Sequence, residues 1–144
     1  MLVSTILADK GADVVTVSPQ QNVQELLALL SQHKVGALVV SNDGKTIAGI
    51  VSERDIVRAL AAGESLMSEP VSTIMTSEVF VSTTHVKIDE LMTVMTSRRI
   101  RHIPITTDSG ELIGIVSIGD LVKARLSELE TEKAALVDYI THGG

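Results

Sequence analysis

Apolar positions along the chain switch between two spacings, and the whole pattern occurs twice. Each half has a short apolar run, then apolar residues three or four positions apart, and then two more apolar runs separated by a polar turn. These segments are 14–17, 23–30, 37–40 and 47–51 in the first half, and 79–81, 88–95, 102–105 and 112–116 in the second. Short apolar runs between turn residues predict strands, and the wider spacing predicts a helix. Because a second helix opens after the last run, each half is predicted to fold as β-α-β-β-α.

The two halves also share a short phrase. Gly-Ile-Val-Ser-Glu-Arg-Asp starts at Gly49, and Gly-Ile-Val-Ser-Ile-Gly-Asp starts at Gly114, 65 positions later. Upstream, Val17-Ser18 matches Val81-Ser82 at an offset of 64, which predicts one extra residue near His85 in the second copy. Two units are too few for a solenoid, so we expect two repeats that face each other around a shared core.

Each phrase ends in Ser-x-x-Asp, which pairs Ser52 with Asp55 and Ser117 with Asp120. A serine N-cap with an acid three residues later is close to a capping box. Capping boxes favour the longer Glu or Gln, however, and both copies have Asp. A carboxylate at a helix start that is not needed for capping is well placed to accept two hydrogen bonds from a vicinal diol such as ribose. A helix cap and a ligand contact are therefore both open interpretations.

A basic cluster is the second candidate site. Four basic residues lie close together in an acidic chain: Arg98, Arg99, Arg101 and His102. Guanidinium groups beside a histidine suit a phosphate group, and the alternative is a solvated basic edge that discourages strand pairing. The first copy has Gly36-Ala37 where the second has Arg101-His102, so the two sites are predicted to be unequal. Arg54 is a candidate for the positive charge that the first copy lacks there.

Composition narrows the classes of partner. Aromatic residues make up 1% of the chain and the net charge is −6, which weighs against single-stranded nucleic acid and against DNA. The chain has no cysteine, no apolar run long enough to span a bilayer, and no basic start of a secretion signal. The four histidines show no metal-ligand spacing, and no nucleophile with its base is visible. We expect a non-enzymatic, cytoplasmic protein with no metal, DNA or membrane partner.

Apolar residues near the C-terminus step by four and three positions along Val122, Leu126, Leu129, Lys133, Leu136 and Ile140. These steps indicate a short heptad seam, interrupted by Lys133. The seam has two equally weighted interpretations: a helix that lies against its own domain, and a contact between two copies of the chain.

The paired phrases, the β-α-β-β-α order and the Arg-His-Ile-Pro-Ile stretch at 101–105 together resemble a cystathionine-β-synthase (CBS) domain pair, or Bateman module. The resemblance covers about residues 2–126. It implies an α/β (α+β) fold with two repeats packed about a pseudo-twofold axis, followed by an amphipathic C-terminal helix. We expect the first repeat at 1–66, the second at 67–126, and the C-terminal helix and tail at 127–144.

The resemblance also implies a function. Members of this family bind adenosyl ligands in two clefts between the repeats, so we expect AMP foremost, with ADP, ATP, NAD or S-adenosylmethionine as alternatives, and no catalytic cofactor. Occupancy would be transmitted to the geometry of a homodimer or to a regulated partner. The alternative is a structural module that dimerises without a ligand and has vestigial clefts.

The residues implied in ligand binding fall into three groups. Ribose contacts are expected at Ser52, Asp55, Ser117 and Asp120. Phosphate contacts are expected at Arg101 and His102, to which the basic residues Arg99 and Arg54 are added as candidates. Contacts to adenine, largely through the backbone, are expected at Asp13, Val15, Thr76, Ser77, Val79, Ile103 and Pro104.

Overall fold

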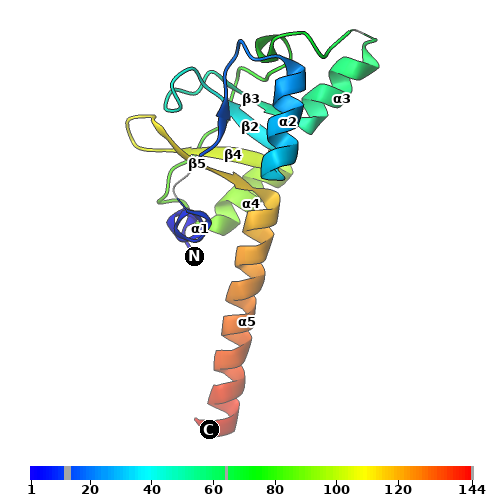
Figure 1. The fold of residues 1–144 in the computed structure, drawn as a ribbon. Coiled ribbons are helices and arrows are strands. Elements are labelled where there is room, and N and C mark those ends of the chain that lie inside the picture. The colour runs from blue at the N-terminus through cyan, green and yellow to red at the C-terminus, as the bar shows by residue number, and fades with distance from the viewer. Residues whose placement is uncertain (12–13, 64, 144) are drawn as a thin grey trace.

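The structure is a computed structural model that describes residues 1–11, 14–63 and 65–143. The first repeat contains β1 (Thr16–Val17), α2 (Val23–His33), β2 (Ala37–Val40), β3 (Gly49–Ser52) and α3 (Glu53–Ala61). The second contains α4 (Ile88–Arg98), β4 (His102–Thr106), β5 (Leu112–Ser117) and α5 (Ile118–His142). The helix α1 (Val3–Lys10) precedes the first repeat, and a short 3-10 helix (Val71–Thr73) lies between the two. Figure 1 shows the repeats stacked on each other, with α5 projecting from one end.

The expected β-α-β-β-α order is confirmed in the first repeat, and only partly in the second. β1 pairs with β2 in parallel and β2 pairs with β3 antiparallel, while β4 pairs antiparallel with β5. The strand expected at 79–81 is not formed. Only the following residue, Ser82, forms a bridge, to Ile105. Its backbone N–H donates to Pro104 O at 3.0 Å and its carbonyl accepts from Thr106 N at 2.8 Å. The next rung of a parallel ladder would need an N–H from Pro104, which proline lacks.

The offset of 64 upstream of the helices is wrong, because the structure keeps 65 throughout. Val17 O accepts from Ser41 N in the first repeat, and Ser82 O accepts from Thr106 N in the second. Val17 therefore corresponds to Ser82 and not to Val81. The N-caps of α2 and α4, Asn22 and Lys87, are also 65 positions apart. No extra residue exists near His85, and the matching letters at 17–18 and 81–82 coincide by chance.

Each core includes residues from a segment outside the β-α-β-β-α unit that it belongs to. The core of the first repeat includes Leu66 and Val71, which follow α3 in the linker. The core of the second repeat includes Val3 and Ile6, which lie on α1 at the start of the chain. The sequence pattern gave no indication of α1 or of this exchange, since both depend on contacts between distant segments.

The shared glycines mark the two places where these covering segments cross a strand. A Cβ atom at Gly49 would lie 2.8 Å from both Thr76 O and Met75 Sδ. A Cβ atom at Gly114 would lie 2.5 Å from Leu7 Cδ2. Glycine is required at Gly49, where a backbone carbonyl occupies the space of a side chain, whereas at Gly114 that space is occupied by the end of the Leu7 side chain.

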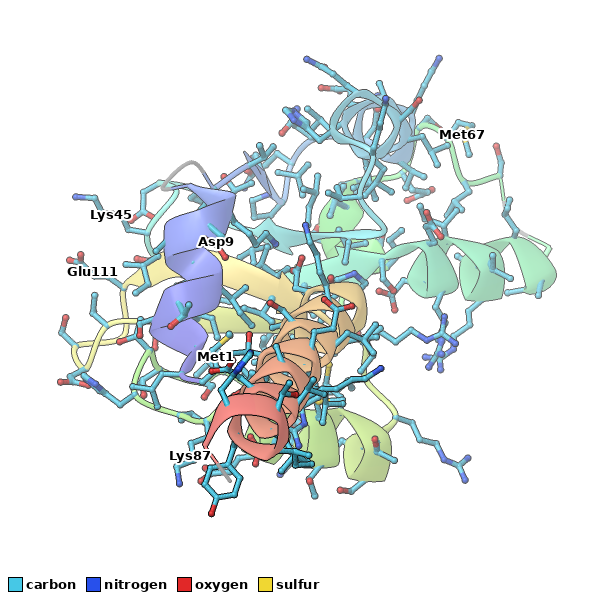
Figure 2. The ribbon with its side chains drawn as sticks, turned by 90° about the horizontal axis from the view of Figure 1, so that it is seen from below. Met1, Asp9, Lys45, Met67, Lys87 and Glu111 are labelled. Carbon is cyan, nitrogen blue, oxygen red and sulfur yellow. The ribbon has the colours of Figure 1, made fainter. Side chains whose placement is uncertain are left out.

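The C-terminal helix is one continuous element from Ile118 to His142. Only its first turns touch the body, where Leu121 is fully buried. Figure 2, which looks from below toward the free end of α5, shows Met1 beside this helix, and the terminal amino group of Met1 donates to Glu128 Oε2 at 2.9 Å. Within the described ranges, no helix is long and apolar enough to cross a membrane.

We expect Gly49→Ala to lower the free energy of unfolding by about 1–3 kcal/mol, because the backbone carbonyl of Thr76 cannot move away from a new methyl group. Gly114→Ala is the matched comparison, and it should cost less because the close atom is the end of the flexible Leu7 side chain. Urea unfolding of both variants measures the difference. A larger loss for Gly114→Ala would contradict this account of the two glycines.

Candidate functional site

The two Ser-x-x-Asp motifs start α3 and α5, and both form capping boxes. Asp55 Oδ2 accepts from the backbone N–H of Ser52 at 2.8 Å, and its equivalent Asp120 Oδ2 accepts from the N–H of Ser117 at 2.9 Å. The helix-cap interpretation is therefore confirmed in both copies, although Asp is shorter than the Glu or Gln that capping boxes favour. The motif positions its carboxylate by capping, and each Asp uses one oxygen atom, Oδ2, to do so.

The second oxygen of Asp55 points toward the linker between the repeats. Thr76 Oγ1 donates to Asp55 Oδ1 at 3.4 Å, a long hydrogen bond. Thr76 is held there by its backbone, which exchanges two hydrogen bonds with Ile50 on β3, at 2.8 and 2.9 Å. A predicted ribose contact and a predicted adenine contact, 21 positions apart in the chain, thus lie side by side.

The equivalent carboxylate in the second repeat has a different neighbour. Lys10 Nζ, at the end of α1, donates to Asp120 Oδ2 at 2.7 Å and to the carbonyl of Ile115 at 2.8 Å. Ile115 corresponds to Ile50, so Lys10 bonds the same two groups that Thr76 bonds in the first repeat. Burial raises the pKa of Asp120, but the hydrogen bonds from Lys10 and Ser117 outweigh it and bring the pKa below its ordinary value. Asp55 therefore has a neutral hydroxyl beside its carboxylate, and Asp120 has an ammonium ion.

His102 lies at the contact between the repeats. A Cβ atom at Gly36 would lie 3.6 Å from His102 Cε1 and 3.8 Å from Glu53 Cδ, so the imidazole lies close to the glycine of the other repeat. Burial lowers the pKa of His102, and the charge of Lys10 lowers it further, against the opposing effects of Asp120 and Glu53. A neutral imidazole at neutral pH follows from this environment.

The four members of the predicted basic cluster have different surroundings. Arg54 Nη1, on α3, donates to the backbone carbonyl of Arg99 at 3.3 Å, so these two residues from different repeats meet. Arg99 ends α4 in the left-handed conformation, with φ 55°. Arg98 instead stacks over the ring of Phe80, 4.5 Å from its centroid. Arg101 is exposed beside His102, and its carbonyl accepts from the N–H of Ile118.

The remaining predicted contacts differ in accessibility. Ser77 is exposed and Val79 and Val15 are half-buried, whereas Ile103 is fully buried in the second core and Pro104 is also buried. Ile103 and Pro104 could therefore meet a ligand only through their backbone atoms. Asp13 lies outside the described residues.

Sequence reasoning missed Lys10 and Glu53. Lys10 lies on a helix that the pattern did not predict, and Glu53 has no counterpart charge in the second copy, where Ile118 takes its place. No motif surrounds either residue. In the part of the chain that the structure describes, no three His, Asp or Glu side chains are grouped so that they could hold a metal ion.

The sequence profile of the CBS domain matches residues 4–62 and 71–127, which is most of the chain. The chain belongs to the CBS-domain family. It is 37% identical to the mitochondrial CBS domain-containing protein CBSX3 of Arabidopsis thaliana, over 98% of this chain and 72% of that protein. It thus shares with its relatives the pair of repeats that the sequence pattern indicated.

Two solved structures of CBS-domain proteins have the same fold. One, from Agrobacterium tumefaciens, has a TM-score of 0.82 and 42% identity, and the alignment covers 87% of this chain and 99% of that one. Another, from Pyrobaculum aerophilum and solved in complex with AMP, has a TM-score of 0.75 and 30% identity, with 91% and 99% covered. In both structures, a pair of CBS repeats of this kind makes up nearly the whole solved chain.

The lowered pKa of His102 predicts how stability depends on pH. The unfolded chain takes up a proton near pH 6.5 that the folded imidazole resists, so the free energy of unfolding should fall as the pH is lowered from 7 toward 5. His102→Gln should flatten this fall, as measured by urea unfolding across the range. His142→Gln, at the exposed end of α5, is the control and should keep the original slope. Equal slopes for all three proteins would contradict the assignment.

Proposed function

We propose that this CBS repeat pair is a sensor that binds an adenosyl nucleotide, AMP foremost, in the cleft that contains Asp55. The observation that carries the proposal is the position of the Asp55 carboxylate. Its Oδ2 atom is committed to the helix cap, and among the described residues its Oδ1 atom has a single long hydrogen bond, to Thr76. A ribose diol can replace that hydroxyl and supply stronger hydrogen bonds to a carboxylate that is already aimed.

The surroundings of Asp55 suit the rest of the ligand. Thr76 and Ser77 are exposed, and Val79 beyond them is half-buried, so an adenine ring would meet backbone groups and an aliphatic side chain. Arg54 and Arg99 meet at the contact between the repeats and are the candidates for the phosphate group. The AMP complex of the relative from Pyrobaculum aerophilum supports this choice of ligand class, with ADP, ATP, NAD and S-adenosylmethionine as alternatives.

A ligand in this cleft would join α3 of the first repeat to the linker that leads into the second. Its binding energy would favour one relative position of the two repeats, which a homodimer or a regulated protein can read. No chemical step is part of this role. We keep a cytoplasmic location as our expectation, although the name of the Arabidopsis relative places that protein in mitochondria.

A second function is favoured by one observation. The apolar seam of α5 is exposed, with Leu126 at 56% and Leu136 at 59%. A module that dimerises without any ligand would need this surface and would not need Asp55. Ligand binding therefore separates the two proposals.

We expect a thermal-shift panel of AMP, ADP, ATP, NAD and S-adenosylmethionine to raise the melting temperature with at least one of them, AMP first. A ligand that binds only the folded state stabilises it by about 2.7 kcal/mol at a hundredfold excess over Kd. The absence of any shift at millimolar concentration would leave the ligand-free dimerisation module as the function.

The control for this panel is a pair of Asp→Asn variants. Asp55→Asn keeps an oxygen that can accept from Ser52 but loses the charge, so the affinity for AMP should fall about tenfold or more. Asp89→Asn makes the same change in the first turn of α4 and should leave the affinity unchanged. If both variants lose the same affinity, Asp55 is not a ligand contact.

We expect the second cleft to bind the nucleotide only after Lys10 is removed. In the wild type, the Lys10 ammonium ion donates to Asp120 Oδ2, beside the capping bond, and so offsets the charge that would strengthen a diol's hydrogen bonds to the remaining oxygen; charge-assisted hydrogen bonds are about twice as strong as neutral ones. Isothermal titration with AMP should give one site per chain for the wild type and approach two for Lys10→Met. Lys45→Met, in the turn between β2 and β3, is the control and should keep one site. A wild-type chain with two equal sites would rule out this inequality.

A further inference from the structure

The helix α5 carries an apolar stripe on a face that its own chain leaves uncovered. The stripe, here called the seam, consists of Val122, Leu126, Leu129, Lys133 and Leu136. Its apolar members are 42–59% exposed, and every described residue from 131 to 143 is exposed. The side of α5 that touches the body is different, since it contains the buried Leu121 and the half-buried Ala124 and Glu128. Figure 1 shows the second half of α5 standing clear of both repeats.

We propose that the seam pairs with the seam of a second copy of this chain, antiparallel, with Leu126 packed against Leu129 of the second copy. This register also places Val122 against Lys133 and Gly119 against Leu136, so the two helices overlap from about residue 119 to 136. The inference rests on the proposed self-association and specifies its surface, direction and register.

Charge complementarity on both flanks of the seam supports this register. In an antiparallel pair, the residues on one flank of the seam face residues on the same flank of the second helix. The same holds for the other flank. Lys123 then faces Glu130 on one flank, and Arg125 faces Glu132 on the other. Because the pair is symmetric, each contact occurs twice, which gives four pairs of opposite charge and none of like charge.

The competing arrangements place like charges together. A parallel pair would put Lys133 against its own copy in the centre of the seam, which is unfavourable at such a position. An antiparallel pair shifted by one heptad would put Glu130 against Glu130 and Glu132 against Glu132. In the proposed register, the aliphatic stem of Lys133 covers Val122 and its ammonium group reaches water.

The start of α5 has room for a second helix. A shallow groove runs along Ile118, Gly119, Val122 and Leu126, with Lys123 and Glu130 at its edge. Gly119 is exposed, and a Cβ atom there would meet only Ser117 Oγ, at 3.6 Å. The proposed register places Leu136 of the second copy over this glycine, where the groove is open.

The contacts within one chain are compatible with pairing. Arg125 lies 3.5 Å from Glu128 and 3.9 Å from Glu132 of its own helix, and its side chain is 38% exposed. A second Glu132 beside the same guanidinium adds a partner without requiring that Glu128 be released. Lys123 has no ion pair within the described residues, so it is free for Glu130 of the second copy.

Single cysteines test the direction, since the natural chain has none. Val122→Cys and Lys133→Cys should each fail to form disulfide dimers when oxidised alone. An equimolar mixture of the two should form a disulfide dimer that contains one of each. A disulfide dimer of Lys133→Cys alone would mean parallel pairing and would overturn the proposal. So would a wild-type chain that sediments as a monomer at high micromolar concentration.

Charge reversal tests the register. Lys123→Glu with Arg125→Glu, and separately Glu130→Lys with Glu132→Lys, should each weaken self-association by at least tenfold in sedimentation equilibrium. Mixing the two double variants should restore it, because all four contacts are then of opposite charge. If mixing the two double variants does not restore self-association, the register is wrong. The AMP-induced thermal shift is measured in the same samples, and its loss with pairing intact would count against the nucleotide proposal alone.

Discussion

The structure depends on an exchange of covering segments between the two repeats. Val3 and Ile6 of α1 are buried in the second core, and Leu66 and Val71 of the linker are buried in the first. Each such aliphatic side chain contributes about 1.5–3 kcal/mol when it is fully buried. Each core is therefore stabilised by residues from outside its own repeat unit. The same segments bring Thr76 beside Asp55 and Lys10 beside Asp120, so the surroundings of each carboxylate follow from how the cores are completed.

The duplicated motif produces two carboxylates with unequal surroundings. Both Asp side chains are aimed by the same capping hydrogen bond, which the N–H of Ser52 or Ser117 donates. The difference comes from the covering segments, which present a threonine hydroxyl in one cleft and a lysine ammonium in the other. Two copies of one motif can thus have different surroundings without any change in the motif, because the charge beside Asp120 comes from Lys10 on α1, outside the second repeat.

The C-terminal helix has two faces with different surroundings. One side of α5 completes the second core through Leu121, while the seam about a quarter turn away is left to solvent in a single chain. The two faces can act independently, since a change in the seam does not touch the core. Pairing through the seam would couple two sensor modules through a rigid element, and the position of the repeats at the base of α5 would then bear on the geometry of the pair.

The sequence by itself determined the repeat, the order of most elements and the motif that aims the carboxylates. Periodicity located α2, α4, β2 and β4 because their apolar residues face a single core, and Ser-x-x-Asp located the starts of α3 and α5 because capping is a local interaction. The expected strand at 79–81 is not formed, because Pro104 across the sheet has no N–H to donate. The offset of 65 upstream of the helices was also not determined by the sequence. Only the tertiary structure decided that Lys10 binds Asp120, that Arg98 stacks on Phe80, and that the seam is exposed. Each of these depends on which distant segments meet, and local sequence patterns do not predict such contacts.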